Sequence, residues 1–167
     1  IVKPFTASGL LVRVEAQLAA ARARKAALRA ASEEQARLQA LLVEAPAAVC
    51  ALRGPDFVIE FANRHILESW GRTSSVIGKP LLEALPEIAD QPFVGQLREV
   101  VATGKPYIAV EALARLDRDH EGSLQDCYFD YVYAPMRAAG DAITGVLVFA
   151  VDVTQKMAIR RRLEMAL

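Results

Sequence analysis

The longest stretch without helix-breaking residues lies near the start of the chain. From Leu10 to Ala45 the sequence contains neither proline nor glycine, and it is rich in Ala, Leu, Arg, Glu and Gln, which favour helix. Ser8 is a suitable N-cap and Pro46 a stop, so the pattern predicts one helix over residues 8–45, about 37 residues and about 55 Å long. A small globular domain does not need such a helix, so we expect a linker.

Apolar residues along this predicted helix follow an imperfect 3-4 repeat, the spacing of a coiled coil. The seam is apolar at Leu11, Val14 and Leu18, and its middle contains the polar residues Lys25, Ser32 and Gln35 on either side of Leu28. We therefore expect a homodimer held by the four apolar residues, with parallel or antiparallel orientation left open. A second register fits the later half equally well: Leu28, Ala31, Gln35, Leu38, Leu42 and Ala45.

The pattern changes after Pro46. Two short runs rich in β-formers, AVCALRG and FVIEFAN, flank the turn residues Gly54-Pro55-Asp56 and predict a hairpin. The elements expected after it are a short helix over 64–70, interrupted helical turns over 74–88, a firmer helix over 93–103, and strands over 107–116, 125–136 and 142–153. This order predicts an α+β fold, in which a five-stranded antiparallel sheet carries helices on one face and is followed by an exit helix.

The last predicted strand runs into the exit helix without a loop. The apolar run Val146–Val151 is followed directly by Asp152-Val153-Thr154 and then by a basic helical segment. Asp and Thr are residue types that begin helices, so simple capping explains them. A joint without a flexible turn would also transmit movement of the sheet, and we expect Asp152 and Thr154 to act as a relay.

Any ligand is expected between the sheet and the helix over 93–103. Alternation along the strand 125–136 places Phe129 and Tyr131 on one face and Asp130 on the other, which we expect to be more exposed. Phe93, Leu97 and Val101 would complete the pocket from the helix. The alternative is that these side chains fill the space completely. The candidate pocket residues are therefore Phe93, Leu97, Val101, Phe129 and Tyr131.

Composition limits the classes of partner. The chain has 20 basic and 20 acidic residues, and no apolar run is long enough to span a bilayer, so we expect neither nucleic acid nor a membrane as partner. A basic cluster from Arg22 to Arg29 is interpreted as a solvated helix flank. Cys50 and Cys127 lie in apolar segments and predict buried thiols in a cytoplasmic protein. The chain begins without Met, so we expect a piece of a longer protein.

No set of residues indicates an enzyme. His65 and His120 lack the partners and spacing of metal ligands, so no metal site is predicted. The sequence has no phosphate-binding loop, no nucleotide-binding glycine fingerprint and no nucleophile elbow. We expect this chain to have no catalytic residues of its own.

Four segments between Leu41 and about Leu163 are distinctive in combination: the hairpin AVCALRGPDFVIEFAN, the segment VIGKPLLEALPE, the strand YFDYVYAPMRAAG, and AITGVLVFAVDVT with its terminal Asp-Val-Thr. Through them this part of the chain resembles a PAS domain of the type found in bacterial sensor kinases. The resemblance implies a five-stranded antiparallel sheet, helices over one face, and a role in sensing or signalling.

The beginning of the chain resembles the end of a response-regulator receiver domain, because KPF precedes LLVRVEAQL. Lys3 would match the lysine that follows the last strand of that family. The resemblance implies four segments. They are a receiver tail over 1–7, a helical linker over 8–45, a PAS domain over 46–154 and the start of an output linker over 155–167.

The PAS resemblance also implies which cofactors are absent. The segment GKPLLEALPEI lacks the cysteine of flavin-binding light sensors, and the helix over 93–103 has no histidine for haem, which leaves only His65. We expect no flavin or haem. The chain is thus interpreted as a sensory and dimerisation module of a two-component protein, joined covalently to receiver and output domains. The alternative is a purely structural dimerisation domain with a filled core. Ligand identity, output domain and signalling direction stay open.

Overall fold

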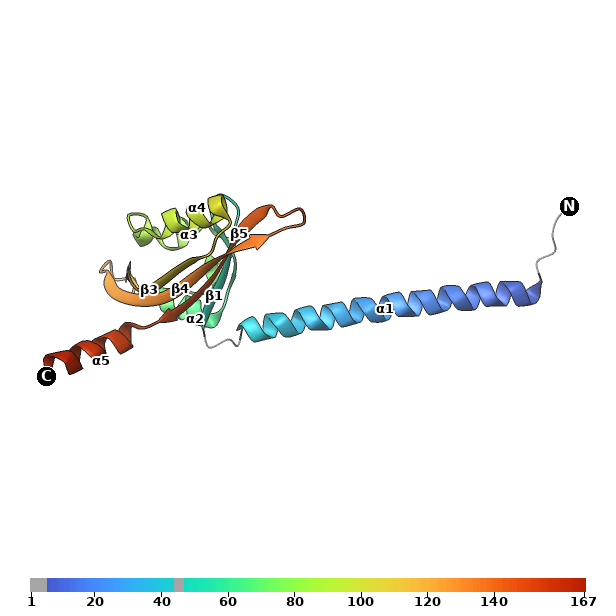
Figure 1. The fold of residues 1–167 in the computed structure, drawn as a ribbon, viewed down its shortest axis with the longest axis horizontal. Coiled ribbons are helices and arrows are strands. Elements are labelled where there is room, and N and C mark those ends of the chain that lie inside the picture. The colour runs from blue at the N-terminus through green and yellow to red at the C-terminus, as the bar shows by residue number, and fades with distance from the viewer. Residues whose placement is uncertain (1–5, 44–46) are drawn as a thin grey trace. The chain divides into compact units, whose positions relative to one another are not determined.

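The computed structural model describes residues 6–43 and 47–167. Helix α1 (Ala7–Val43) forms one unit, and the rest of the chain forms a second, compact unit that contains the sheet (Figure 1). Along the described residues no helix is both long and apolar enough to cross a membrane. Lys3 and Pro46 lie outside the described residues, so the receiver tail and the predicted stop stay predictions, as do the four segment boundaries.

Helix α1 is a single, uninterrupted helix of 37 residues, as its composition predicts. It begins one residue before the expected cap Ser8, because Thr6 takes that role: its hydroxyl and its carbonyl oxygen accept from the N–H groups of Gly9 and Leu10. Apolar residues are spread around the helix, and the four proposed seam residues are all exposed in the single chain. Dimerisation through Leu11, Val14, Leu18 and Leu28 stays a prediction.

The second unit begins with the predicted hairpin of β1 (Ala48–Arg53) and β2 (Val58–Ala62). Asn63 follows and is buried, with an exposed fraction of 2%. Its carboxamide oxygen accepts from the N–H of Ile66, which caps helix α2 (Arg64–Trp70), and from the N–H of Val49 in β1. One side chain therefore both starts the helix and ties it to the sheet.

Short helical turns lead from α2 to a helix of 11 residues. They are η1 (Ser74–Val76), α3 (Leu81–Ala84) and η2 (Pro86–Ile88), kept short by the turn residues predicted there. Helix α4 (Phe93–Thr103) has the predicted bounds and ends at Gly104, whose φ of +68° is the left-handed conformation that glycine adopts most readily.

Three long strands complete the sheet: β3 (Tyr107–Leu116), β4 (Gln125–Arg137) and β5 (Ile143–Asp152). The strand order is β2-β1-β5-β4-β3, with every neighbour antiparallel, so the first hairpin pairs with the last strand. Helices α3 and α4 lie on one side of this sheet in Figure 1, and the main core lies between these helices and the sheet. The predicted α+β fold is confirmed.

Helix α5 (Thr154–Met165) follows β5 with only Val153 between them. The N–H of Val153 still donates to the carbonyl of Tyr128 in β4 at 2.8 Å, so pairing with the sheet continues to the start of the helix. The absence of a loop at this junction is confirmed.

Candidate functional site

The predicted alternation of strand β4 is confirmed. Phe129, Tyr131 and Tyr133 are buried and face the helices, whereas Asp130 and its neighbours on the other face are half-buried. Tyr131 and Tyr133 pack with ring centroids 4.7 Å apart, and Phe93 meets Tyr131 edge-on at 5.9 Å. The strand thus supplies an aromatic wall to the space beneath α4.

Helix α4 presents Phe93, Leu97 and Val100 to the sheet, a row spaced by four and then three residues. Val101 is not part of this wall, which corrects the expectation. Its side chain is 36% exposed, whereas Val100 is 1% exposed. The buried row continues from Leu97 to Val100, three residues later. Val101, four residues after Leu97, therefore lies beside the buried face of the helix.

A cavity of about 80 Å³ lies between the sheet and the helices. Its walls come from every strand except β2, together with α2, α3, η2 and α4. Four of the five predicted pocket residues line it: Phe93, Leu97, Phe129 and Tyr131. Sequence reasoning missed Cys50 and Trp70, which lie far from these residues in the chain. Whether the cavity takes a ligand stays a prediction.

A hydrogen-bonded polar cluster adjoins the cavity wall at Tyr131, although Tyr131 alone of its three members lines the cavity. The hydroxyl of Tyr131 donates to the carboxamide oxygen of Gln96 at 2.5 Å, and the amide nitrogen of Gln96 donates to the Tyr107 hydroxyl at 3.2 Å. Burial raises the pKa of Tyr131 to about 12, so its phenol is neutral at ordinary pH. Gln96 was missed, although its place three residues after Phe93 put it beside the apolar row.

No group of described residues could hold a metal ion. His65 is exposed on α2 and is not among the residues that line the cavity. A ring nitrogen of exposed His120 lies 2.7 Å from the carbonyl oxygen of Gly71. Cys50 and Cys127 are free, buried thiols, and burial raises the pKa of both, so neither is an activated thiolate.

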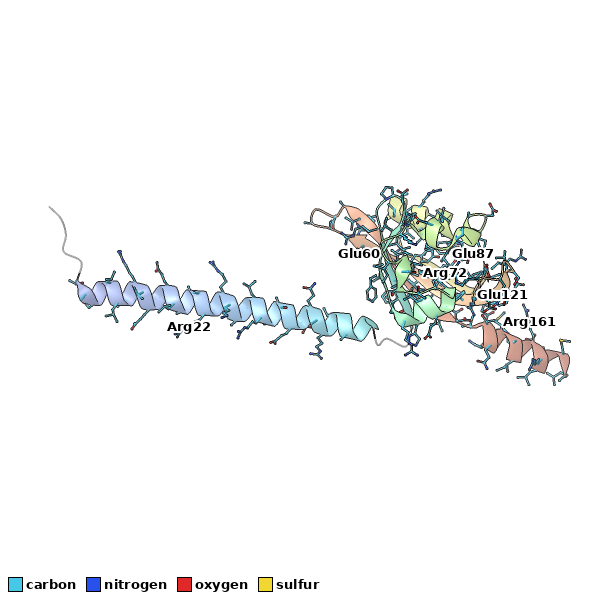
Figure 2. The ribbon with its side chains drawn as sticks, turned by 180° about the vertical axis from the view of Figure 1, so that it is seen from behind. Arg22, Glu60, Arg72, Glu87, Glu121 and Arg161 are labelled. Carbon is cyan, nitrogen blue, oxygen red and sulfur yellow. The ribbon has the colours of Figure 1, made fainter. Side chains whose placement is uncertain are left out.

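Behind the cavity wall lies a buried ion pair that the sequence did not indicate. Arg72 and Glu87, side by side in Figure 2, are 10% and 7% exposed, and one guanidinium nitrogen donates to both carboxylate oxygens at 2.9 and 3.0 Å. Arg72 also donates to the carbonyl oxygens of Trp70, Ala84 and Asp117. It therefore joins α2, α3 and η2 to the loop that follows β3.

The same loop sits directly on the end of α2. Gly71 has a φ of +65°, and a Cβ at this position would lie 2.2 Å from the carbonyl oxygen of Arg118. Only glycine fits both the left-handed conformation and the close approach. The side chain of Arg118 connects this loop to β5, because its guanidinium lies 2.7 Å from the carboxylate of Asp152 at the end of that strand.

Asp152 and Thr154 are in direct contact. Asp152 Oδ1 accepts from the backbone N–H of Thr154 at 2.9 Å and from its hydroxyl at 2.5 Å. The Thr154 hydroxyl accepts from the N–H of Tyr128, so Thr154 bonds to the sheet and does not cap its own helix. Burial acts to raise the pKa of Asp152, but the hydrogen bonds from Thr154 and Arg118 outweigh it and hold the pKa below its ordinary value.

Comparison with known proteins agrees with this architecture. The sequence model described as PAS fold matches residues 42–158. An RNA-binding Light-Oxygen-Voltage receptor is similar in structure, with a TM-score of 0.61 and 19% identity over 79% of this chain and 36% of its own. The PAS domain of a Colwellia psychrerythraea protein has a TM-score of 0.57 and 14% identity, covering 72% of this chain and 98% of that one.

A third similar structure is the VqmA–ligand–DNA complex from Vibrio cholera. It has a TM-score of 0.56 and 22% identity, covering 71% of this chain and 51% of VqmA. The chain thus spans about a third of the RNA-binding receptor and about half of VqmA. The expectation that nucleic acid is excluded as a partner was wrong, because this fold occurs in receptors that bind RNA and DNA. A net charge of zero averages over one chain and does not exclude such partners.

Proposed function

The chain belongs to the PAS fold family, and on that premise we propose that it is a sensory module of a bacterial two-component signalling protein. The parent is a histidine kinase or a response regulator, and the module relays a conformational signal through its flanking helices. The observation that carries this proposal is the connection from the cavity wall to α5. Hydrogen bonds join Arg72 to Asp117, and the next residue, Arg118, to Asp152.

The cavity favours a small, uncharged ligand. Its volume of about 80 Å³ is below the roughly 150 Å³ of an apolar cavity that admits benzene. Its lining is apolar apart from tyrosine hydroxyls, and an unpaired charge placed there would be strongly disfavoured. A flavin or a haem does not fit this volume, and we propose that the domain uses neither.

The proposed relay begins with side chains that pack in the cavity wall. Trp70 and Ile88 line the cavity, and each lies within two residues of a member of the Arg72–Glu87 pair. A ligand that moves these side chains would move the ion pair, the loop at Asp117 and then the carboxylate that holds Thr154. The module itself is proposed to be non-enzymatic, and the output belongs to the parent.

Two partners follow from the flanking segments. The exposed apolar residues of α1, among them Leu11 and Leu18, support a homodimer through this helix. The output domain beyond α5 is a kinase or a nucleic-acid-binding domain, and the RNA-binding receptor and the VqmA–ligand–DNA complex support the second class. The competing function is a purely structural dimerisation domain, which the small size of the cavity favours.

Native mass spectrometry and thermal shift with a library of small neutral molecules separate these functions. We expect a co-purifying or added compound to raise the melting temperature of the wild type. Ala114→Val narrows the cavity and should abolish that rise, whereas Ala102→Val, on the exposed side of α4, should preserve it. No bound compound, no rise, and a more stable Ala114→Val variant would together favour the structural domain.

A further inference from the structure

Strand β3 contains one residue in a conformation that strands do not use. Glu111 has a φ of +52°, and the pairing of β3 with β4 shifts register between Ala109 and Ala112. Glu111 therefore lies in a β-bulge. Residues other than glycine seldom adopt positive φ and keep it only where surrounding contacts hold them there.

Two contacts hold Glu111. Its backbone N–H donates to the carboxylate of Asp130 on β4 at 2.7 Å. Its own carboxylate accepts from both terminal nitrogens of Arg160 on α5, each at 2.8 Å. Such a two-pronged pair between guanidinium and carboxylate has a defined geometry. The bulge thus positions an acidic side chain for the exit helix.

One face of the exit helix contacts the sheet, and the opposite face is exposed. Arg161, labelled in Figure 2, donates to the Tyr128 hydroxyl at 3.2 Å, and its guanidinium lies 5.2 Å from the centre of that ring. Met157, three residues before Arg160, is buried. Ile159 and Leu163 lie on the opposite side and are 51% and 64% exposed.

We propose that Glu111 is a latch that holds the exit helix on strands β3 and β4 and whose release frees α5 to rearrange. Its ion pair with Arg160 is partly exposed, at 28% and 47% for the two side chains. Exposed pairs of this kind are weak, so a small shift between β3 and β4 is enough to separate it. Release would also let the backbone of Glu111 return to an extended conformation. The latch rests on the proposed function only in taking α5 as the output route.

Hydrogen exchange of the α5 amides, measured on the full chain without ligand, tests the latch. Glu111→Gln keeps the side-chain shape but removes the charge, and Arg160→Gln does the same from the helix. Each should raise the exchange rate of the α5 amides about fivefold. The exchanged pair Glu111→Arg with Arg160→Glu should restore slow exchange. The matched control is Glu60→Gln, which breaks the exposed Arg53–Glu60 pair on β1 and β2 and should leave α5 unchanged.

The results separate the latch from the sensing function. Unchanged α5 exchange in both single variants overturns the latch, whatever the parent protein does. Faster exchange in both, with recovery in the exchanged pair, supports it even if no ligand is found. In the full-length parent, Glu111→Gln should shift the basal output. In the domain that carries the same substitution, a ligand should still raise the melting temperature. If the output is unchanged although α5 is released, α5 docking has no regulatory role and the latch proposal fails.

Discussion

The carboxylate of Asp152 joins three parts of the domain. One oxygen lies 2.7 Å from the guanidinium of Arg118 in the loop after β3, and the other accepts two hydrogen bonds from Thr154. Asp152 itself ends β5, and Thr154 begins α5. A movement of the loop, the sheet or the exit helix therefore changes the surroundings of a single side chain.

Asp152→Ala and Thr154→Ala should alter output in the full-length parent while the isolated domain stays folded. Loss of the Thr154 hydroxyl leaves the Tyr128 N–H without its acceptor and should cost about 1 kcal/mol of unfolding free energy. Kinase or transcription assays report the output, and circular dichroism reports the fold. Normal output from both variants would leave this junction a structural connection only.

The Arg72–Glu87 pair should behave as a buried ion pair. Arg72→Ala or Glu87→Ala leaves an uncompensated charge and should lower the unfolding free energy by about 3–5 kcal/mol, measured by urea denaturation. Arg72→Met with Glu87→Met should recover much of that loss. Arg53→Ala, in an exposed pair, is the control and should cost no more than about 1 kcal/mol. Equal losses for the buried and exposed pairs would contradict this assignment.

Tyr131 should make the fold sensitive to alkali. Burial raises its pKa from 10.0 to about 12, so the folded state holds its proton more tightly than the unfolded state does. Its contribution is therefore complete below pH 10 and is lost as the pH rises through 12. The urea midpoint should fall across this range, and less steeply in Tyr131→Phe. Identical slopes would show that the buried phenol does not determine alkaline stability.

Dimerisation can be assigned to α1 by truncation. A chain of residues 44–167 should be monomeric in light scattering, whereas the full chain should be dimeric. Leu18→Lys with Leu28→Lys should weaken the full-length dimer, because both side chains are exposed in the single chain and are proposed to meet a second copy. A truncated domain that dimerises as tightly as the full chain would place the interface elsewhere.

The elements with local markers were the ones predicted best. Helix α2 has its cap at Asn63, α4 ends at Gly104, and both have the expected bounds. The pocket face of β4 followed from simple alternation. Patterns of this kind depend on neighbouring residues, which a sequence displays directly.

The contacts that connect the site could not be predicted in this way. Arg72 bonds to residues 15 and 45 positions away, and nothing in the spacing of these residues indicates that they meet. Threonine is a residue type that often caps helices, but the hydroxyl of Thr154 instead accepts a hydrogen bond from the N–H of Tyr128 in β4. The role of Glu111 was harder still to predict, because a positive φ is unusual for glutamate.

The bulge at Glu111 also has a consequence for solubility. Strand β3 is at one edge of the sheet, where backbone N–H and C=O groups have no partner strand. A long, regular edge invites strands of other molecules to pair with it, and a bulge that twists the edge interrupts such pairing. A substitution that straightens β3 at this position would therefore lengthen the regular edge. We expect the cost to appear as aggregation of folded protein, even where the domain itself unfolds no more readily.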